Sequence, residues 1–292
     1  HCHYDHTGGL AELVRAIVMG IRDYMDKCGF SRLVLGLSGG IDSAVCAALA
    51  AEAAGPDRVW ALSMPSGYSL PHGRSDAERL ARKLGIHFDH LPIDGLRAAY
   101  RDALRPALGD VTTTVVEENL QARIRGALVM AYANHHQRML ALATGNKSEL
   151  SVGYCTLYGD MAGGLAPIGD LFKTRVYQVA DYFNRSEETI PRRIIERPPS
   201  AELRPGQADT DALPPYDVLD PILEQYVEGG LDAARIRQGG FDLATVERVV
   251  KMVEQSEFKR RQAAPVLRVS PRAFGAGRQI PIARGLHREP AS

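Results

Sequence analysis

The sequence predicts an α/β protein whose doubly wound parallel sheet carries flanking helices and a C-terminal helical extension. Short apolar runs alternate with segments whose apolar residues recur at helical spacing, which is the order of strand–helix–strand units. The first apolar run, Arg32–Leu37, is nearly continuous, as in a strand buried on both faces of a parallel sheet. Right-handed crossovers between such strands place helices on both faces of the sheet.

The elements of the first half follow one another without long gaps. A first helix over Leu10–Lys27 has one apolar face and ends at Gly29. The remaining strands are expected at Arg58–Met64, His87–Ile93 and Met139–Thr144, and the remaining helices at Asp42–Ala54, Asp76–Leu84, Leu96–Leu104 and Glu117–His136.

The rhythm changes after Gly145. Gly and Asp become dense up to Gly169, and Pro191–Pro221 is rich in Pro and Asp, which is typical of functional lids or of disordered loops. A last helix is expected at Leu243–Arg261, followed by a Pro/Gly/Arg tail. We therefore expect one domain over residues 10–292, preceded by a tail or boundary remnant at residues 1–9.

Composition indicates which partners and which cellular compartment to expect. Lys plus Arg equals Asp plus Glu, at 35 each, so no basic field favours nucleic acid. The four Cys are far apart without a C-x-x-C pair, which indicates reduced thiols. The sequence shows neither a signal peptide nor an apolar run of the roughly 20 residues that span a bilayer. We expect a cytoplasmic protein with no membrane or nucleic-acid partner.

The N-terminal histidines leave two interpretations open. His1, His3 and His6 form an H-x-H-x-D-H cluster that resembles the metal-binding signature of metallo-β-lactamase-type hydrolases. Such a site needs strands that place the imidazoles, and here a helix follows instead. A frayed tail is the simpler interpretation, and a metal hydrolase stays as an alternative function.

A Ser/Gly-rich turn joins the first strand to the first crossover helix. Two glycines allow close backbone approach, while Ser38, Ser43 and the helix N-terminus offer hydrogen-bond donors to a phosphate chain. No Lys-Ser/Thr pair follows the glycines, so the turn is not a Walker A loop. Asp42 can cap the helix or hold a Mg²⁺ that is bound to the phosphates.

The segment Leu35–Ser43 resembles the pyrophosphatase loop, S-G-G-x-D-S, of the N-type ATP pyrophosphatases, whose fold is Rossmann-like (adenine nucleotide alpha-hydrolase-like). In that superfamily the loop grips the β- and γ-phosphates while an acid substrate attacks the α-phosphate, giving an adenylated intermediate and pyrophosphate. The resemblance implies ATP contacts at Gly36, Leu37, Ser38, Gly39, Gly40, Ile41, Asp42 and Ser43.

Four further segments resemble the NAD synthetase family, and closest is the synthetase part of bacterial glutamine-dependent members. They are Glu118–Arg125, Thr144–Glu149, Gly153–Asp160 running into Leu171–Arg175, and Pro199–Leu203 followed by Leu213–Asp217. Near the C-terminus, Phe258–Gln262 and Ser270–Gly275 resemble the synthetase part of the glutamine-dependent members. The resemblance implies further ATP contacts at Thr144, Lys173 and Ser200, deamido-NAD contacts at Asn119, Arg123, Glu149 and Lys259, a Mg²⁺ held by Asp42 and Glu149, and catalytic roles for Asp42 and Lys173.

Each of these residues also has a plain structural interpretation. Arg123 can belong to a solvated helix face, Glu149 can be an acid near a helix N-terminus, and Lys259 can lie at a solvated helix end. Two positions depart from the ammonia-dependent members, because Leu157 replaces their Lys and Gly164 replaces their second Asp. Those two deamido-NAD contacts are not carried over.

The resemblance implies that ATP, deamido-NAD and ammonia give NAD, AMP and pyrophosphate, in a homodimer with deamido-NAD at its interface. We call Leu35–Ser43 the phosphate loop. The about 30 residues before it are too few for the amidase of glutamine-dependent members. We therefore expect either that free ammonia is the nitrogen donor or that the chain is a fragment of a longer enzyme. The alternatives are a catalytically silent nucleotide-binding subunit and a tRNA-modifying ATP pyrophosphatase.

Overall fold

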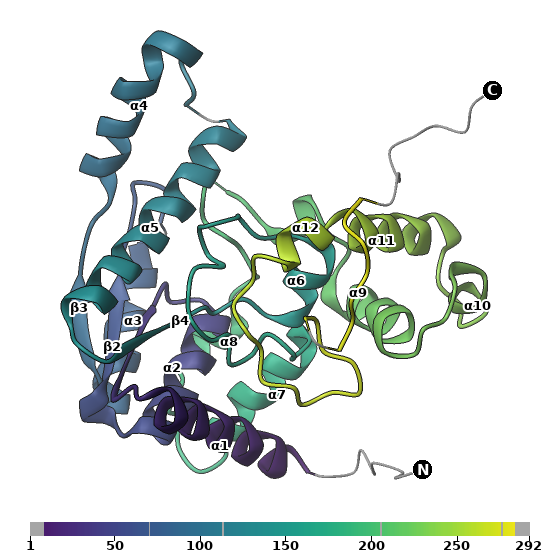
Figure 1. Cartoon of the computed structure of the whole chain (residues 1–292), viewed down its shortest axis with the longest axis horizontal. Coiled ribbons are helices and arrows are strands. Elements are labelled where there is room, and N and C mark those ends of the chain that lie inside the picture. The colour runs from purple at the N-terminus through teal and green to yellow at the C-terminus, as the bar shows by residue number, and fades with distance from the viewer. Residues whose placement is uncertain (1–8, 70, 113, 205, 276, 284–292) are drawn as a thin grey trace.

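The computed structural model describes residues 9–283 except 70, 113, 205 and 276. Four parallel strands, β1 (Arg32–Gly36), β2 (Val59–Ser63), β3 (His87–His90) and β4 (Met139–Leu142), form a sheet of order β3-β2-β1-β4. The strand order reverses between β1 and β4, where α/β sheets open a crevice for ligands. The predicted doubly wound parallel sheet is confirmed (Figure 1).

Side-chain alternation along the strands divides the core into two layers. Leu33 and Leu35 of β1 join a core with α1 (Leu10–Cys28) and α2 (Ile41–Ala54), whereas Val34 joins a second core with α5 (Val115–His135). Successive side chains of a strand point to opposite faces, so this central strand needs apolar residues on both. The nearly continuous apolar run follows from that requirement.

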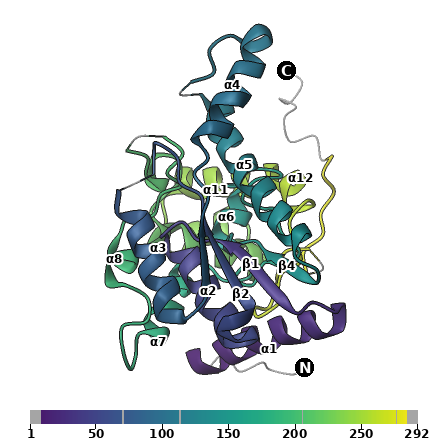
Figure 2. The ribbon, with the colours of Figure 1, turned by 90° about the vertical axis from the view of Figure 1, so that its left-hand side faces the viewer.

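Helices cover both faces of the sheet. The face that carries α1 and α2 also carries α3 (Pro71–Leu84) and α7 (Lys173–Phe183). On the opposite face α5 packs across β1 and β4, and α4 (Asp94–Leu108) packs against α5. Figure 2 shows α4 extending beyond the rest of the molecule. No helix in the described ranges is both long and apolar enough to cross a membrane.

Short helices form a second lobe with its own core. They are α6 (Lys147–Val152), α9 (Tyr216–Leu223), the π-helical turn η3 (Glu224–Glu228), α10 (Ala233–Arg237), α11 (Leu243–Gln255) and α12 (Glu257–Arg260). Apolar residues such as Leu219, Val227 and Val249 are buried there. The predicted C-terminal helical extension is therefore confirmed, and Figure 1 shows it on the side of the sheet where β4 lies.

Several predicted elements have other bounds in the structure. The helix expected at Leu243–Arg261 is two helices, because Ser256 turns the chain and its hydroxyl donates to the carbonyl of Val152 at 3.0 Å. The segment Pro191–Pro221 contains α8 (Arg192–Glu196), a 3₁₀ turn η2 (Asp209–Asp211) and most of α9. Helix α3 begins five residues earlier than expected, at Pro71, since Pro is tolerated in a first helical turn.

A buried lysine joins α6 to three other segments of the chain. The Lys147 side chain is fully buried, and its Nζ lies 2.8 Å from Asp170 Oδ1 and 2.5 Å from Glu228 Oε1. It also donates to Ser270 Oγ at 2.7 Å and to the carbonyl of Arg272 at 2.9 Å. A desolvated ammonium is stable only with such partners, so these contacts fix α6 and the 270–272 segment together.

We predict that Lys147→Met lowers the free energy of unfolding by about 3 kcal/mol or more, because it leaves the buried carboxylates of Asp170 and Glu228 without a cation. Chemical denaturation at neutral pH measures this loss. The matched control Lys251→Met lies on the exposed side of α11 and should change stability by about 0.5 kcal/mol or less. Equal losses in the two variants would contradict a stabilising role for Lys147.

Candidate functional site

A cavity lies at the carboxyl ends of the strands, beside the point where strand order reverses. Its volume is about 490 Å³, and its walls come from the phosphate loop, α5, the segment after β4, and residues 197–209. We call residues 197–211 the strap. The position is the one at which open α/β sheets bind ligands.

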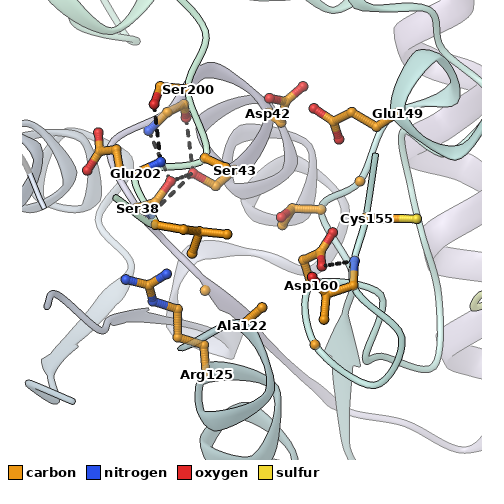
Figure 3. Close-up of a pocket in the computed structure, with 18 of the residues that line it drawn as sticks. Ser38, Asp42, Ser43, Ala122, Arg125, Glu149, Cys155, Asp160, Ser200 and Glu202 are labelled. Carbon is orange, nitrogen blue, oxygen red and sulfur yellow. Dashed lines mark hydrogen bonds between the residues drawn. The ribbon is translucent and has the colours of Figure 1, made fainter. Parts of the chain in front are cut away.

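The phosphate loop is held open by its own serines (Figure 3). Ser38 Oγ lies 3.3 Å from Ser43 Oγ and accepts a hydrogen bond from the amide of Gly40 at 3.2 Å. Gly40 precedes α2 and has no side chain that could cap it, so the first amides of this helix are available to an anion. Gly39 has φ +83°, and a Cβ there would meet the carbonyl oxygen of Gly73 at 2.5 Å.

A buried ammonium lies between two acids that come from different helices. Lys173 Nζ, at the start of α7, lies 2.5 Å from Asp42 Oδ2 and 3.5 Å from Glu149 Oε1. Asn146 Nδ2 donates to Asp42 Oδ1 at 2.9 Å. Asp42 therefore faces the cavity partners rather than capping α2, and Figure 3 shows it beside Glu149. The predicted Asp42, Glu149 and Lys173 lie together.

Glu149 is positioned by a capping box. Asn146 Oδ1 accepts from the amide of Glu149 at 3.0 Å, and Glu149 Oε2 accepts from the amide of Asn146 at 3.3 Å. This reciprocal pair fixes the first turn of α6 and aims the carboxyl group at the cavity. The plain interpretation of Glu149 as an acid near a helix N-terminus is thus correct, and it is also what places Glu149 beside Asp42.

Burial and neighbouring charges shift the pKa values of Glu149 and Lys173. Burial and the nearby Asp42 carboxylate raise the pKa of Glu149 to about 8, although Lys173 opposes this. Burial lowers the pKa of Lys173, but Asp42 and Glu149 more than offset it, so its pKa is raised overall. Lys173 is therefore a permanent cation at neutral pH, and the acids exceed it in number.

Asp209, on the strap, is a third acid that the sequence did not single out. It is 4% exposed, lines the cavity, and its pKa is raised by burial, while Tyr216 Oη donates to its Oδ2 at 2.8 Å. Its Oδ1 has no hydrogen-bond partner among the described residues. Its place among the Pro- and Asp-rich residues 191–221 gives no pattern that separates it from neighbouring acids.

Hydrogen bonds hold the strap in the cavity wall, both within the strap and to α5 and the phosphate loop. Ser200 Oγ donates to the carbonyl of Gln207 at 2.6 Å, and Gln121 Nε2 of α5 donates to the carbonyl of Leu203 at 2.8 Å. Arg197 pairs with Glu202, and its Nη1 donates to the carbonyl of Gly39 at 3.4 Å. Ser200 lies in the cavity wall, as does Thr144.

The predicted deamido-NAD residues do not all face this cavity. Asn119 and Lys259 line it: Thr156 Oγ1 donates to Asn119 Oδ1 at 2.8 Å, and Lys259 Nζ donates to the carbonyls of Gly153 and Cys155 at 2.7 and 2.8 Å. Arg123 is exposed outside the lining and donates to the carbonyl of Leu157 at 3.2 Å. Its contact with deamido-NAD stays a prediction.

Two lining residues near Asn119 were not chosen from the sequence. Arg125 donates to the carbonyl of Met64 at 3.0 Å, and burial lowers its pKa to about 10. Asp160 accepts from the amide of Thr156 at 2.7 Å. Arg125 follows Arg123 by two helical positions, so only one of the pair can face the cavity, and the structure places Arg125 there.

A side chain at Gly164 would contact Leu140 of β4. A Cβ at this position would meet Leu140 Cδ1 at 2.5 Å, so a larger residue requires a smaller or displaced Leu140. Leu157 packs against the core of the helical lobe rather than lining the cavity. The His1, His3 and His6 cluster lies outside the described residues, as does nearly all of the predicted tail at residues 1–9.

The chain resembles known proteins over most of its length. Residues 13–263 match the family described as NAD synthase. The glutamine-dependent NAD(+) synthetase of Synechocystis sp. is 52% identical over 94% of this chain and 49% of its own length. That of Thermotoga maritima is 47% identical over 93% of this chain and 47% of its own length. The chain therefore spans about half the length of these curated relatives.

Solved structures give the same fold. The glutamine-dependent NAD+ synthetase from Acinetobacter baumannii, in complex with adenosine diphosphate, has a TM-score of 0.63 and 43% identity over 95% of this chain and 50% of its own. The NMN synthetase from Francisella tularensis has a TM-score of 0.74 and 28% identity over 86% of this chain and 96% of its own. Since the family match and these identities cover nearly the whole sequence, the chain belongs to the NAD synthase family.

Proposed function

We propose that this chain catalyses the ATP-dependent amidation of deamido-NAD to NAD through an adenylated intermediate, with release of AMP and pyrophosphate. The observation that carries the proposal is the Asp42–Lys173–Glu149 cluster, which lies where a Ser/Gly phosphate loop opens into the cavity. Membership of the NAD synthase family supports the choice of substrates.

The chemistry explains why the cavity needs these groups. A carboxylate is a poor acceptor for ammonia, so its oxygen first attacks the α-phosphate of ATP and pyrophosphate leaves. The amides and hydroxyls of Ser38–Ser43 hold the β- and γ-phosphates, and the fixed charge of Lys173 stabilises negative charge that develops as pyrophosphate departs. Ser200 and Thr144 in the cavity wall would contact the nucleotide.

A magnesium ion fits the donor set at Asp42 and Glu149. Three acids, with Asp209, lie near one ammonium, and one Asp209 oxygen has no hydrogen-bond partner among the described residues, so carboxyl oxygens remain available to a cation, which would favour the ionised form of Glu149. No group of three acids, histidines or cysteines in the described part of the chain encloses a metal by itself. Mg²⁺ is commonly bound by one or two carboxylates plus phosphate oxygens. When bound, it would neutralise charge on the phosphates.

Ammonia completes the reaction. The nitrogen lone pair attacks the acyl carbon of the adenylate, the bond between that carbon and the phosphate oxygen breaks, AMP leaves with its electron pair, and the nitrogen loses a proton to water. Water competes for the same carbon, so a strap fastened over the cavity favours amidation over hydrolysis. We propose that this chain uses free ammonia as its nitrogen source. Relatives of about twice its length are named glutamine-dependent.

A homodimer would complete the deamido-NAD site. Arg123 faces away from the cavity, so it can contact deamido-NAD only where the substrate extends beyond this cavity. The nearby α4–α5 pair exposes Tyr100, Leu108 and Val115, which favours a protein contact there. We also propose that the enzyme is cytoplasmic, because ATP is available in that compartment. Thiols stay reduced there, and the cysteines of the described residues are all free: Cys28, Cys46 and Cys155.

The purified chain, given ATP, Mg²⁺, deamido-NAD and ammonium, should release pyrophosphate and AMP in step with NAD. Omitting deamido-NAD should abolish release, and the acid mononucleotide that would give NMN should be a poorer substrate. Glutamine in place of ammonium should give no NAD. Pyrophosphate released equally well without any acid substrate, or preference for the mononucleotide, would contradict the proposed reaction.

The raised pKa of Glu149 predicts a pH dependence of stability. Between its ordinary value of 4.5 and about 8, folded Glu149 holds a proton that the unfolded chain releases, so the free energy of unfolding falls as pH rises through this window. Glu149→Gln has no such proton. The stability of the wild type relative to this variant should therefore be lower at about pH 8.5 than at about pH 5.

Urea denaturation at the two pH values, without nucleotide or metal, measures this difference. The exposed Glu247→Gln on α11 is the control, and its stability should follow that of the wild type at both values. A constant difference between the wild type and Glu149→Gln would show that Glu149 ionises normally.

A further inference from the structure

Helix α7 begins with Lys173, and the residue before it cannot cap the helix. That residue is Phe172, whose side chain has no hydrogen-bonding atom. The first amides of a helix have no partner within the helix, and at a buried end they need acceptors from elsewhere. The acceptors that serve this helix therefore fix where the Lys173 backbone lies.

Two residues from the helical lobe supply these acceptors. The amide of Lys173 donates to Ser148 Oγ at 2.9 Å, and Ser148 Oγ donates in turn to Asp220 Oδ1 at 2.5 Å. The amide of Thr174 donates to Asp220 Oδ2 at 2.8 Å. Asp220 is 3% exposed, and its carboxylate lies at the positive end of the α7 dipole. Both oxygens of Asp220 are thus used at the start of α7.

The helix that carries Asp220 also contacts the other end of the Lys173 side chain. Tyr216 precedes Asp220 by four residues on α9, so both project from one face. Lys173 Nζ lies 5.3 Å from the centre of the Tyr216 ring. Figure 1 shows α6, α7 and α9 meeting beside the sheet. One helix therefore holds the backbone of Lys173 and borders its ammonium group.

We propose that Asp220 is a positioning residue for Lys173, which caps α7 from a separate helix and thereby sets the lysine ammonium against Asp42. The inference rests on the proposed function, in which Lys173 stabilises the departing pyrophosphate. Asp220 does not line the cavity, so it acts on the rate of the chemical step through Lys173 rather than on substrate binding.

Asp220→Asn tests this role, since the amide keeps the shape of the side chain but removes its charge and one of its two acceptors. We expect kcat for NAD formation to fall about 10²-fold, as for a small misplacement of a reacting group, with KM for deamido-NAD within about twofold. Asp217→Asn is the matched control, because Asp217 is an exposed acid on the same helix, and it should leave kcat unchanged.

A double-mutant cycle separates positioning from general loss of structure. In a Lys173→Met background, Asp220→Asn should lower kcat no further, because the group that it positions is gone. Ser148→Ala is a milder second variant that removes the bridging hydroxyl, and its effect should vanish in the same background. If the Asp220 and Lys173 losses multiply, or if KM rises as kcat falls, Asp220 is only structural.

A readout without turnover keeps this inference distinct from the proposed function. Amide hydrogen exchange in the first turn of α7 should be faster in Asp220→Asn than in the wild type and unchanged in Asp217→Asn. Exchange that does not change would overturn the capping role even if the enzyme makes NAD. A wild-type chain that makes no NAD, with exchange altered as expected, would count against the proposed reaction and not against the cap.

Discussion

The charge balance around Lys173 is the constraint on which the site depends. Asp42, Glu149 and Asp209 converge on one buried ammonium, and burial makes every unpaired charge there costly. Lys173 keeps its proton and pairs with Asp42, while burial and the Asp42 carboxylate raise the pKa of Glu149. A bound cation would favour the ionised form of Glu149, so the cluster suits a cation. The phosphate loop beside it offers the opposite character, with helix amides and hydroxyls that suit an anion. A nucleotide with its magnesium ion matches both halves.

Each member of the cluster is placed by a different part of the fold. Asp42 lies in the first turn of α2, and Glu149 is held by the capping box with Asn146. Asp209 lies at the start of η2, in the strap. The helical lobe supplies the supports, because Lys147 fastens α6 and Asp220 fastens α7. The C-terminal half of the chain therefore does not form a separate module. Its buried polar contacts hold α6 and α7, the helices that carry Glu149 and Lys173, against one another.

The sequence predicts the parts of this arrangement that depend on local pattern. Alternating apolar runs and helical periodicities predict the parallel sheet, and the loop Leu35–Ser43 predicts a wall of the cavity, because these signals lie within a few residues of one another. The sequence does not single out Asp209 or Asp220, because the acids that surround them in the sequence look the same. Only the fold brings Asp209 near Lys173 and Asp220 near Ser148. Arg123 shows the opposite case: family likeness selects it, while helix geometry turns it away from the cavity of a single chain.

The measurement that tests the charge balance most directly is the affinity for ATP as a function of free Mg²⁺, determined by calorimetry for the wild type and for Asp42→Asn. We predict that Mg²⁺ strengthens ATP binding to the wild type, because the anionic phosphates otherwise face Asp42 and Glu149, and that Asp42→Asn loses most of this dependence. Wild-type affinity that does not change with Mg²⁺, or an equal Mg²⁺ dependence in Asp42→Asn, would contradict a cation site at these acids.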